Sequence, residues 1–369
     1  MASKPHTNRI NEPAARSRRA GRRPVLYHEG RIPVRKDVPV SQFLDSMIAR
    51  AKADKKTIVL PEGNDIRTLK AAEAILAEGI ADLIVLGDAD DIAAAGCNLE
   101  GARIVDFRTS ELREPYAEKL AELRAAKGMT LEQALELMDN ELYFGMMMVE
   151  TGEADAFITG LYTKYSNTIK VAKEVIGIRP EFKHFGTMHI LNSKKGTYFL
   201  ADTLINRHPN AETLIDIAKL SEYTVRFFNH TPVMAMLSYS NFGTDKEGSP
   251  VSVHEAVDYM QRNYPDLAID GEMQVNFAMN RELRDAKYPF TRLKGKDVNT
   301  LIFPNLSSAN SAYKLLQSMD MDSELIGPIQ MGLNKPIHFT DFESSVRDIV
   351  NITAVAVIDA IVDKKKAGK

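Results

Sequence analysis

Hydrophobic positions in the first part of the chain alternate between strand spacing and helix spacing. Two short apolar runs lie on either side of a segment whose apolar residues recur every three or four positions: KTIVLPEG (56–63), DIRTLKAAEAILAEG (65–79) and ADLIVLGD (81–88). A strand, a helix and a strand at this spacing form a βαβ unit, in which parallel strands are covered by helices. An amphipathic segment before this unit predicts a helix with Ser41 as its N-cap.

The same alternation continues through the first half of the chain. The pattern predicts a helical region from Glu114 to Met138, a strand over ADAFITG (154–160) and a helix after that strand. Residues Met146–Met148 lie on a helical pattern, so we expect these methionines in the core. This half therefore predicts one α/β domain.

A change of pattern near Pro180 indicates a domain boundary. Between Phe182 and Asp202 we expect two strands on either side of a Lys-Lys-Gly turn, as in an antiparallel hairpin. Apolar runs then alternate with helices that we expect to begin at Ala211, Val253 and Ser308. The second region therefore repeats the α/β theme, and the last segment returns to the first domain.

We therefore expect an α/β protein with two α/β domains and a cleft between them. The first domain is discontinuous and consists of residues 41–179 plus 328–365, while residues 180–327 form the second. The net charge of the chain is -3, but residues 1–40 hold ten basic and three acidic residues, which gives +7 there and -10 elsewhere. Such an arm, with no apolar periodicity and no apolar signal-peptide core, is expected to be disordered and not a secretory signal. Contact with a partner or polyanion, an organelle transit peptide and a solvated extension remain open for it.

Composition excludes several classes of protein. Cys97 is the single cysteine, so an internal disulfide framework and a cysteine-based zinc site are excluded. No stretch approaches the roughly 18 consecutive apolar residues of a membrane span. We expect a cytoplasmic protein without a membrane segment.

Candidate chemistry is expected after each predicted strand, because ligands of open α/β sheets bind beyond the carboxyl ends of the strands. No GxxxxGK[ST] or GxGxxG motif lies at a strand–helix junction, which excludes these nucleotide fingerprints. Asp270 and Glu272 have no third carboxylate nearby in sequence, so we expect a solvent-facing strand end and no metal site there. His338 is expected to be a packed or solvated histidine and not a ligand.

Seven segments in consistent order resemble the phosphotransacetylase family, also called phosphate acetyl/butyryl transferases. They are residues 56–88, 127–160, FLADT (199–203), VMAMLSYSNFGT (233–244), IDGEMQ (269–274), LIFPNLSSANSAYKLLQ (301–317) and IGPIQMGLNKPI (326–337). The resemblance implies a fold like that of decarboxylating isocitrate dehydrogenases and a homodimer or higher homo-oligomer, with dimerisation through residues 180–327. It implies no covalently bound cofactor, and acetyl-CoA and CoA as substrate or effector. The implied reaction is acetyl-CoA + phosphate = acetyl phosphate + CoA, with an aspartate as base and arginines on the phosphate.

The resemblance is incomplete in the last motif, where the family has Ser-Arg-Gly followed by the catalytic aspartate. Asp348 matches that aspartate, whereas Asp341, Phe342 and Glu343 stand at the Ser-Arg-Gly positions. Arg347 is a possible substitute for the missing arginine, although pairing with Asp348 or Glu343 at the surface is favoured.

Two other family loops also depart from the pattern. In the loop after Gly160 the family's cation is kept as Lys170, while its aspartate has become Asn167, and the lysine of a third loop is lost from residues 238–243. The resemblance thus assigns catalytic roles to Asp348 and Lys170. It assigns acyl-CoA or phosphate contacts to Ser166, Asn167, Asn305, Gly332, Asp341, Phe342 and Arg347.

The second-half variants look like the phosphotransacetylase-like C-terminal domain of hybrid malic enzymes, and this resemblance implies an acetyl-CoA sensor that does not catalyse transfer. Three hypotheses therefore stay open: a phosphate acetyltransferase with a weakened catalytic loop, a non-catalytic acetyl-CoA-sensing or assembly module, and a transferase for another acyl-CoA or acceptor. A metal- and NAD-dependent dehydrogenase is the least favoured, because its carboxylate cluster is not visible in the sequence.

Overall fold

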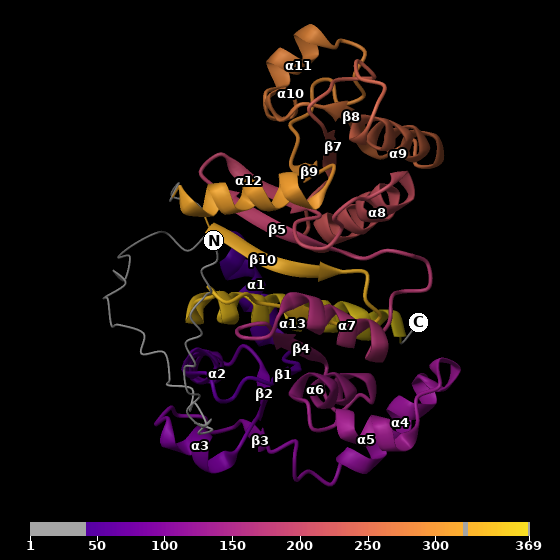
Figure 1. Ribbon diagram of the computed structural model, residues 1–369. Coiled ribbons are helices and arrows are strands. Elements are labelled where there is room, and N and C mark those ends of the chain that lie inside the picture. The colour runs from indigo at the N-terminus through magenta and orange to yellow at the C-terminus, as the bar shows by residue number, and fades with distance from the viewer. Residues whose placement is uncertain (1–41, 320–323, 368–369) are drawn as a thin grey trace, which may run out of the picture. The chain divides into compact units, whose positions relative to one another are not determined.

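The computed structural model describes residues 42–319 and 324–367. The basic arm and the expected N-cap Ser41 lie outside the described residues. The two sheets of this part and their helices are shown in Figure 1.

The first sheet has five parallel strands in the order β11-β4-β1-β2-β3. Its strands are β1 (Thr57–Leu60), β2 (Asp82–Leu86), β3 (Arg103–Val105), β4 (Ala156–Thr159) and β11 (Ile337–Phe339). β1, β4 and β11 are almost continuously apolar, because helices cover both faces of a parallel sheet. The chain runs outward from β1 to β3 and then continues on the other side of β1, so the topological switch point lies between β1 and β4.

The second sheet has six strands in the order β10-β5-β6-β9-β7-β8. Its strands are β5 (Gly186–Ser193), β6 (Gly196–Ala201), β7 (Val233–Leu237), β8 (Ala268–Met273), β9 (Thr300–Ile302) and β10 (Glu324–Met331). β5 pairs antiparallel with β6 and with β10, whereas the remaining pairs are parallel. The expected hairpin is therefore confirmed.

The helices follow the expected order. They are α1 (Gln42–Ala53), α2 (Ile66–Glu78), α3 (Ala89–Ala94), α4 (Arg113–Leu123), a 3-10 turn (Ala125–Lys127), α5 (Leu131–Leu137), α6 (Glu141–Glu150), α7 (Tyr165–Val175), α8 (Ala211–Phe227), α9 (Ser249–Asn263), α10 (Val275–Met279), α11 (Arg281–Lys287), α12 (Leu306–Ser318) and α13 (Val346–Ala367). The methionines of α6 are fully buried, as expected. Within residues 42–319 and 324–367, no helix combines the length and the apolar character needed to cross a membrane.

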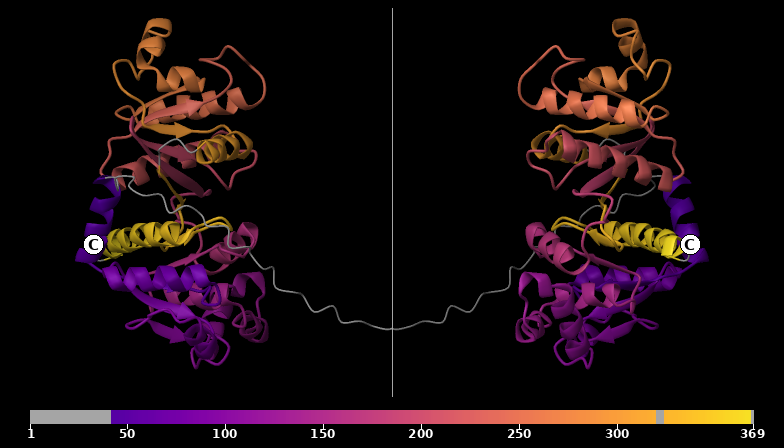
Figure 2. Two further views of the ribbon diagram at one scale, coloured as in Figure 1. Left: turned by 90° about the vertical axis from the view of Figure 1, so that its left-hand side faces the viewer. Right: turned by 90° about the vertical axis from the view of Figure 1, so that its right-hand side faces the viewer.

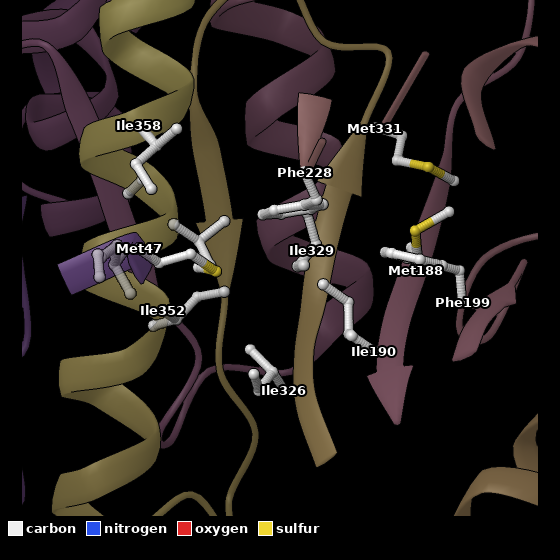
Figure 3. Packing of buried hydrophobic residues seen from close by; sticks show 14 of the residues in the cluster. Met47, Met188, Ile190, Phe199, Phe228, Ile326, Ile329, Met331, Ile352 and Ile358 are labelled. Carbon is white, nitrogen blue, oxygen red and sulfur yellow. The ribbon is translucent and has the colours of Figure 1, made fainter. Parts of the chain in front are cut away.

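The C-terminal segment returns to the first sheet, as expected. β11 pairs with β4, and α13 packs against both β4 and β10. Figures 1 and 2 show α13 between the elements of the two sheets. A single apolar cluster joins α1, α13 and the second sheet, and Figure 3 labels ten of its members: Met47, Met188, Ile190, Phe199, Phe228, Ile326, Ile329, Met331, Ile352 and Ile358.

Several element ends differ from the sequence pattern. The expected boundary after residue 327 falls inside β10, so the second sheet extends to Met331. α9 begins at Ser249 and not at Val253, because Pro250 lies in its first turn, where a missing N–H is tolerated. α12 begins at Leu306 and not at Ser308, because the Asn305 side chain caps it.

Candidate functional site

A cavity of about 310 Å³ lies at the carboxyl ends of β4 and β11. The first sheet and the loops after its strands supply Gly160, Thr163, Tyr165, Thr340, Asp341, Phe342 and Glu343, and the second sheet's side supplies Leu204, Tyr313 and Lys314. This is the edge where open α/β sheets bind ligands, and it adjoins the switch point between β1 and β4. We call this cavity the β4–β11 pocket.

The loop between β11 and α13 is held in one conformation by local hydrogen bonds. The N–H of Asp341 donates to Ser344 Oγ at 3.0 Å, and the N–H of Ser344 donates to the Asp341 carbonyl at 3.0 Å. From α2, Arg67 donates to the carbonyl oxygens of Phe342 and Ser344 at 2.8 and 3.2 Å. The backbone is thus fixed, while 58% of the Phe342 residue surface stays exposed at the pocket.

Lys314 of α12 pairs with the loop from the opposite side of the pocket. Its Nζ lies 2.9 Å from a Glu343 oxygen and 3.4 Å from an Asp341 oxygen. Burial lowers the pKa of Lys314, but the hydrogen bond to Glu343 and the charge of Asp341 outweigh it and raise the pKa above its ordinary value. Lys314 could not be predicted as a site residue, because nothing in the sequence links it to a loop 27 residues away.

Aromatic rings form much of the remaining pocket wall. The ring of Tyr165 packs edge-on against Phe339 at 5.1 Å, and Tyr313 stacks on His189 at 4.3 Å. Burial lowers the pKa of His189 to about 3, so this histidine is neutral and serves as a packing partner. Thr340 Oγ1 is buried and has no hydrogen-bond partner among the described residues.

Glu62 connects the carboxyl ends of β1 and β4 at the switch point. Its Oε1 accepts hydrogen bonds from Thr159 Oγ1 at 3.1 Å and from the N–H groups of Gly160 and Leu161, each at 2.9 Å. Burial raises the pKa of Glu62, and these hydrogen bonds oppose only part of the rise. Glu62 therefore positions the loop that carries Thr163 and Tyr165 into the pocket.

Asp348 lies in the first turn of α13 and forms a capping arrangement. Its carboxylate accepts from the N–H and the Oγ of Ser345 at 2.8 and 2.7 Å, while its own N–H faces Ser345 Oγ at 3.3 Å. The expected pairing of Arg347 with Asp348 or Glu343 is wrong. Arg347 donates instead to Glu324 of β10 at 2.7 Å, because the helix turns its side chain toward the second sheet.

Three expected ligand-binding residues of α7 do not reach the β4–β11 pocket. Ser166, Asn167 and Lys170 are exposed, and none of them lines the pocket. The buried face of α7 carries Thr168 and Val171 instead. Asp341 and Phe342 line the pocket, whereas Lys170 does not.

Asn305 and Gly332 each line another cavity. Asn305 accepts from the Ser308 N–H at 3.0 Å, and it lines a cavity of about 550 Å³ at the carboxyl ends of β7, β8 and β9. Gly332 has a positive φ of 95°, and a Cβ there would meet Leu220 at 3.1 Å. Neither residue lines the β4–β11 pocket, and their expected ligand contacts stay predictions.

The expectation of a solvent-facing strand end at Asp270 and Glu272 is wrong. Asp270 is 6% exposed and accepts from Thr291 Oγ1 at 2.6 Å and from the Arg292 N–H at 2.8 Å. Glu272 is fully buried and accepts from the N–H of Gly243 at 2.7 Å. Both carboxylates thus accept hydrogen bonds from neighbouring loops and hold these loops against the sheet. Among the described residues, no cluster of histidine, cysteine or carboxylate groups suits a metal ion.

Comparisons with known proteins agree over most of the chain. A family model described as Phosphate acetyl/butaryl transferase matches residues 42–357. The chain is 37% identical over 327 residues to the phosphate acetyltransferase of Thermoanaerobacterium thermosaccharolyticum, which covers 86% of this chain and 99% of that one. It is 34% identical to the NADP-dependent malic enzyme of Salmonella typhimurium, over 86% of this chain and 43% of that enzyme.

Solved structures of phosphotransacetylases have a similar fold. A phosphotransacetylase from Streptococcus pyogenes superposes with a TM-score of 0.82 at 30% identity, covering 88% of this chain and 100% of that one. The phosphotransacetylase EutD from Staphylococcus aureus superposes with a TM-score of 0.78, also at 30% identity. The family match, the curated relatives and the common fold together show that this chain belongs to the phosphate acetyl/butyryl transferase family.

Proposed function

We propose that this protein binds acetyl-CoA at the β4–β11 pocket and exchanges the acetyl group with phosphate only slowly. The observation that carries the proposal is the pairing of Lys314 with both Asp341 and Glu343. The positive charge in the pocket wall is thereby neutralised, and one carboxylate charge is left over. Negative charge repels phosphate and the oxyanion that forms during acyl transfer.

The size of the expected loss follows from the chemistry of such sites. Removing one group that stabilises developing negative charge typically lowers the rate by about 10²- to 10³-fold. Phe342 offers no such group. Asp348 follows the pocket loop in the first turn of α13 but does not line the pocket, and we propose its carboxylate as the base on the CoA thiol, which supports slow transfer only.

A second candidate function is acetyl-CoA sensing without transfer. It is supported by the likeness to the NADP-dependent malic enzyme of Salmonella typhimurium and by the hydrogen bonds that tie Asp348 to Ser345. These hydrogen bonds engage the Asp348 carboxylate in the first turn of α13. Both candidates require acetyl-CoA binding, and they differ in turnover.

The test combines binding and turnover. Calorimetric titration with acetyl-CoA should give saturable binding, and phosphate-dependent release of the CoA thiol should be at least about 10²-fold slower than for the Thermoanaerobacterium relative assayed beside it. Turnover abolished by Asp348→Asn would support slow transfer and remove the sensing candidate. Turnover at the relative's rate would contradict the proposal, as would absence of acetyl-CoA binding.

Restoring the arginine refines this test. Phe342→Arg alone should raise phosphate-dependent turnover only slightly, because the new guanidinium would lie between Asp341 and Glu343 and pair with them. The triple change Asp341→Ser, Phe342→Arg and Glu343→Gly should raise it further. Equal rates for the single and triple variants would show that the carboxylates do not limit phosphate use.

We also propose that the protein is a homodimer joined through the second sheet's region. Support comes from exposed apolar side chains on and beside α10 and α11, where Val275, Met279, Leu283 and Phe290 are 53, 44, 43 and 68% exposed. Light scattering of the purified protein should give twice the chain mass, and Phe290→Lys should shift the mass toward the monomer. A monomer at all concentrations would contradict this proposal.

A further inference from the structure

The charge at the β4–β11 pocket is unbalanced toward the negative. Lys314 lies between the carboxylates of Asp341 and Glu343, at 3.4 and 2.9 Å. One ammonium against two carboxylates leaves a net charge of about -1, and no further cation is found among the described lining residues. Such a pocket favours a positively charged group over an anion.

The aromatic side chains in the pocket wall also favour binding of an organic ammonium group. Tyr165, Tyr313 and Phe342 all line the pocket, and the electron-rich faces of such rings attract cations. Lys314 shows this attraction within the protein itself, because its Nζ lies 5.5 Å from the centre of the Tyr313 ring while it contacts the carboxylates. Rings and carboxylates thus already hold one ammonium, with one carboxylate charge left for a second.

A residue with a buried hydroxyl that has no hydrogen-bond partner among the described residues lines the same wall. Thr340 is 5% exposed, its Oγ1 has no partner among the described residues, and the residue lines the pocket. A buried hydroxyl without a partner is costly and indicates a missing polar group. A neutral thioester carbonyl suits this hydroxyl, because it accepts a hydrogen bond and adds no negative charge to the pocket.

We propose that the acyl acceptor at the β4–β11 pocket is a primary amine, bound as its ammonium between the carboxylates and the aromatic rings. This inference rests on the proposed binding of acetyl-CoA. The ammonium first loses one proton to solvent. The amine nitrogen then forms a C–N bond to the thioester carbon while the C–S bond breaks, and the CoA thiolate takes up a proton. The products are an acetamide and free CoA, with one proton released overall.

The experiment compares three acceptors with acetyl-CoA and the purified full chain. They are n-butylamine, n-butanol, which has the same length but no ammonium, and inorganic phosphate. Thiol release is followed with a thiol-reactive dye at about pH 8.5, where part of the amine is neutral. Rates are taken above those without protein, and N-butylacetamide is identified by mass spectrometry.

The expected result is saturable thiol release with n-butylamine that exceeds the release with butanol or phosphate by up to about fivefold, together with the acetamide. Release with butylamine no faster than with butanol, or faster release with phosphate, would overturn the inference. If calorimetry shows acetyl-CoA binding but no amine is acetylated, the inference fails while the binding proposal stands. If acetyl-CoA does not bind, the binding proposal itself fails.

Two variants test the assigned groups. Glu343→Gln should raise the half-saturating butylamine concentration several-fold, with a smaller effect on maximal rate. Thr340→Val keeps the side-chain shape and should lower the maximal rate with little change in that concentration. Glu118→Gln, an exposed glutamate on α4, is the control and should change neither. The same response from all three variants would contradict the assignment.

Discussion

Glu62 illustrates how one buried carboxylate can position a binding loop. It is 3% exposed, and its Oε1 accepts three hydrogen bonds from the segment that follows β4. Two of these come from backbone N–H groups that would otherwise lack partners beside the sheet. The side chain therefore replaces ladder hydrogen bonds at the switch point, where the loop leaves the sheet.

Glu62→Gln should change how stability depends on pH. Because the pKa of Glu62 is raised in the folded protein, its contribution to stability is full below the unfolded pKa and is lost as the pH rises through the folded pKa. Glutamine keeps an accepting oxygen but does not titrate. The free energy of unfolding of the wild type minus that of the variant should therefore be larger at about pH 5 than at about pH 7.

Urea denaturation at the two pH values measures this difference. Glu118→Gln is the matched control, since Glu118 is exposed. The free energy of unfolding of the wild type minus that of this variant should not vary with pH. A Glu62→Gln difference that shrinks as the pH falls would show that the carboxylate is stabilised in its charged form.

The sequence predicted some pocket residues and missed others for geometrical reasons. Asp341 and Phe342 were predicted because they stand in a motif after a strand. Thr340 and Lys314 were not, because an unpartnered hydroxyl and a contact across 27 residues leave no trace in local spacing. Lys170 was expected as a catalytic residue from its motif position alone, and its exposed side chain on α7 does not line the pocket.

At the scale of elements, α6 and β4 approach each other closely at Gly145. A Cβ on Gly145 would lie 2.4 Å from Cε2 of Phe157, a fully buried residue of β4. Alanine favours helix over glycine by about 1 kcal/mol in an open helix. Here the close contact with the Phe157 ring outweighs that preference. The need for space between α6 and β4 therefore explains why position 145 is a glycine.

Gly145→Ala should therefore destabilise the protein, by about 1–3 kcal/mol, through overpacking against the Phe157 ring. Phe157→Leu alone should also destabilise it by leaving space. The double variant should lose less than the sum of the two, since the smaller side chain makes room for the new methyl group. Thermal and urea unfolding of all four proteins measure the coupling free energy. A stabilised Gly145→Ala protein, or strictly additive effects, would contradict the close approach.

Element types followed from hydrophobic spacing more reliably than element ends did. The βαβ unit at the start of the first domain, the hairpin and the methionine-rich helix are confirmed. Each could be predicted because its hydrophobic pattern extends over the whole element. The ends of α9 and α12 were set by Pro250 and the Asn305 cap, which act on one turn only.

At the scale of the described chain, two segments and several ion pairs connect the two sheets. The first segment runs from α7 to β5 and the second from β10 to β11. These two segments contact each other through an isolated β-bridge between Ile178 and Leu333 and through a hydrogen bond from Arg179 Nε to the Leu333 carbonyl at 3.0 Å. Two further links, Lys314 with the β11–α13 loop and Arg347 with Glu324, connect elements of the first sheet with those of the second. The loop at the β4–β11 pocket is thus held from both sheets.

Replacing both cations, in a Lys314→Met/Arg347→Met variant, should loosen this loop without unfolding the protein. Each pair is at least partly exposed, so its loss should lower the free energy of unfolding by about 1 kcal/mol or less. Amide hydrogen exchange in residues 341–345 should nevertheless become faster, because Asp341 and Glu343 lose the partner that holds their side chains. Lys183→Met, which removes an exposed pair with Glu212 away from the pocket, is the control and should leave this exchange unchanged. Exchange that rises equally throughout the chain would show that the ion pairs support the whole fold. Unchanged exchange in residues 341–345 would show that Arg67 and the internal hydrogen bonds alone fix the loop.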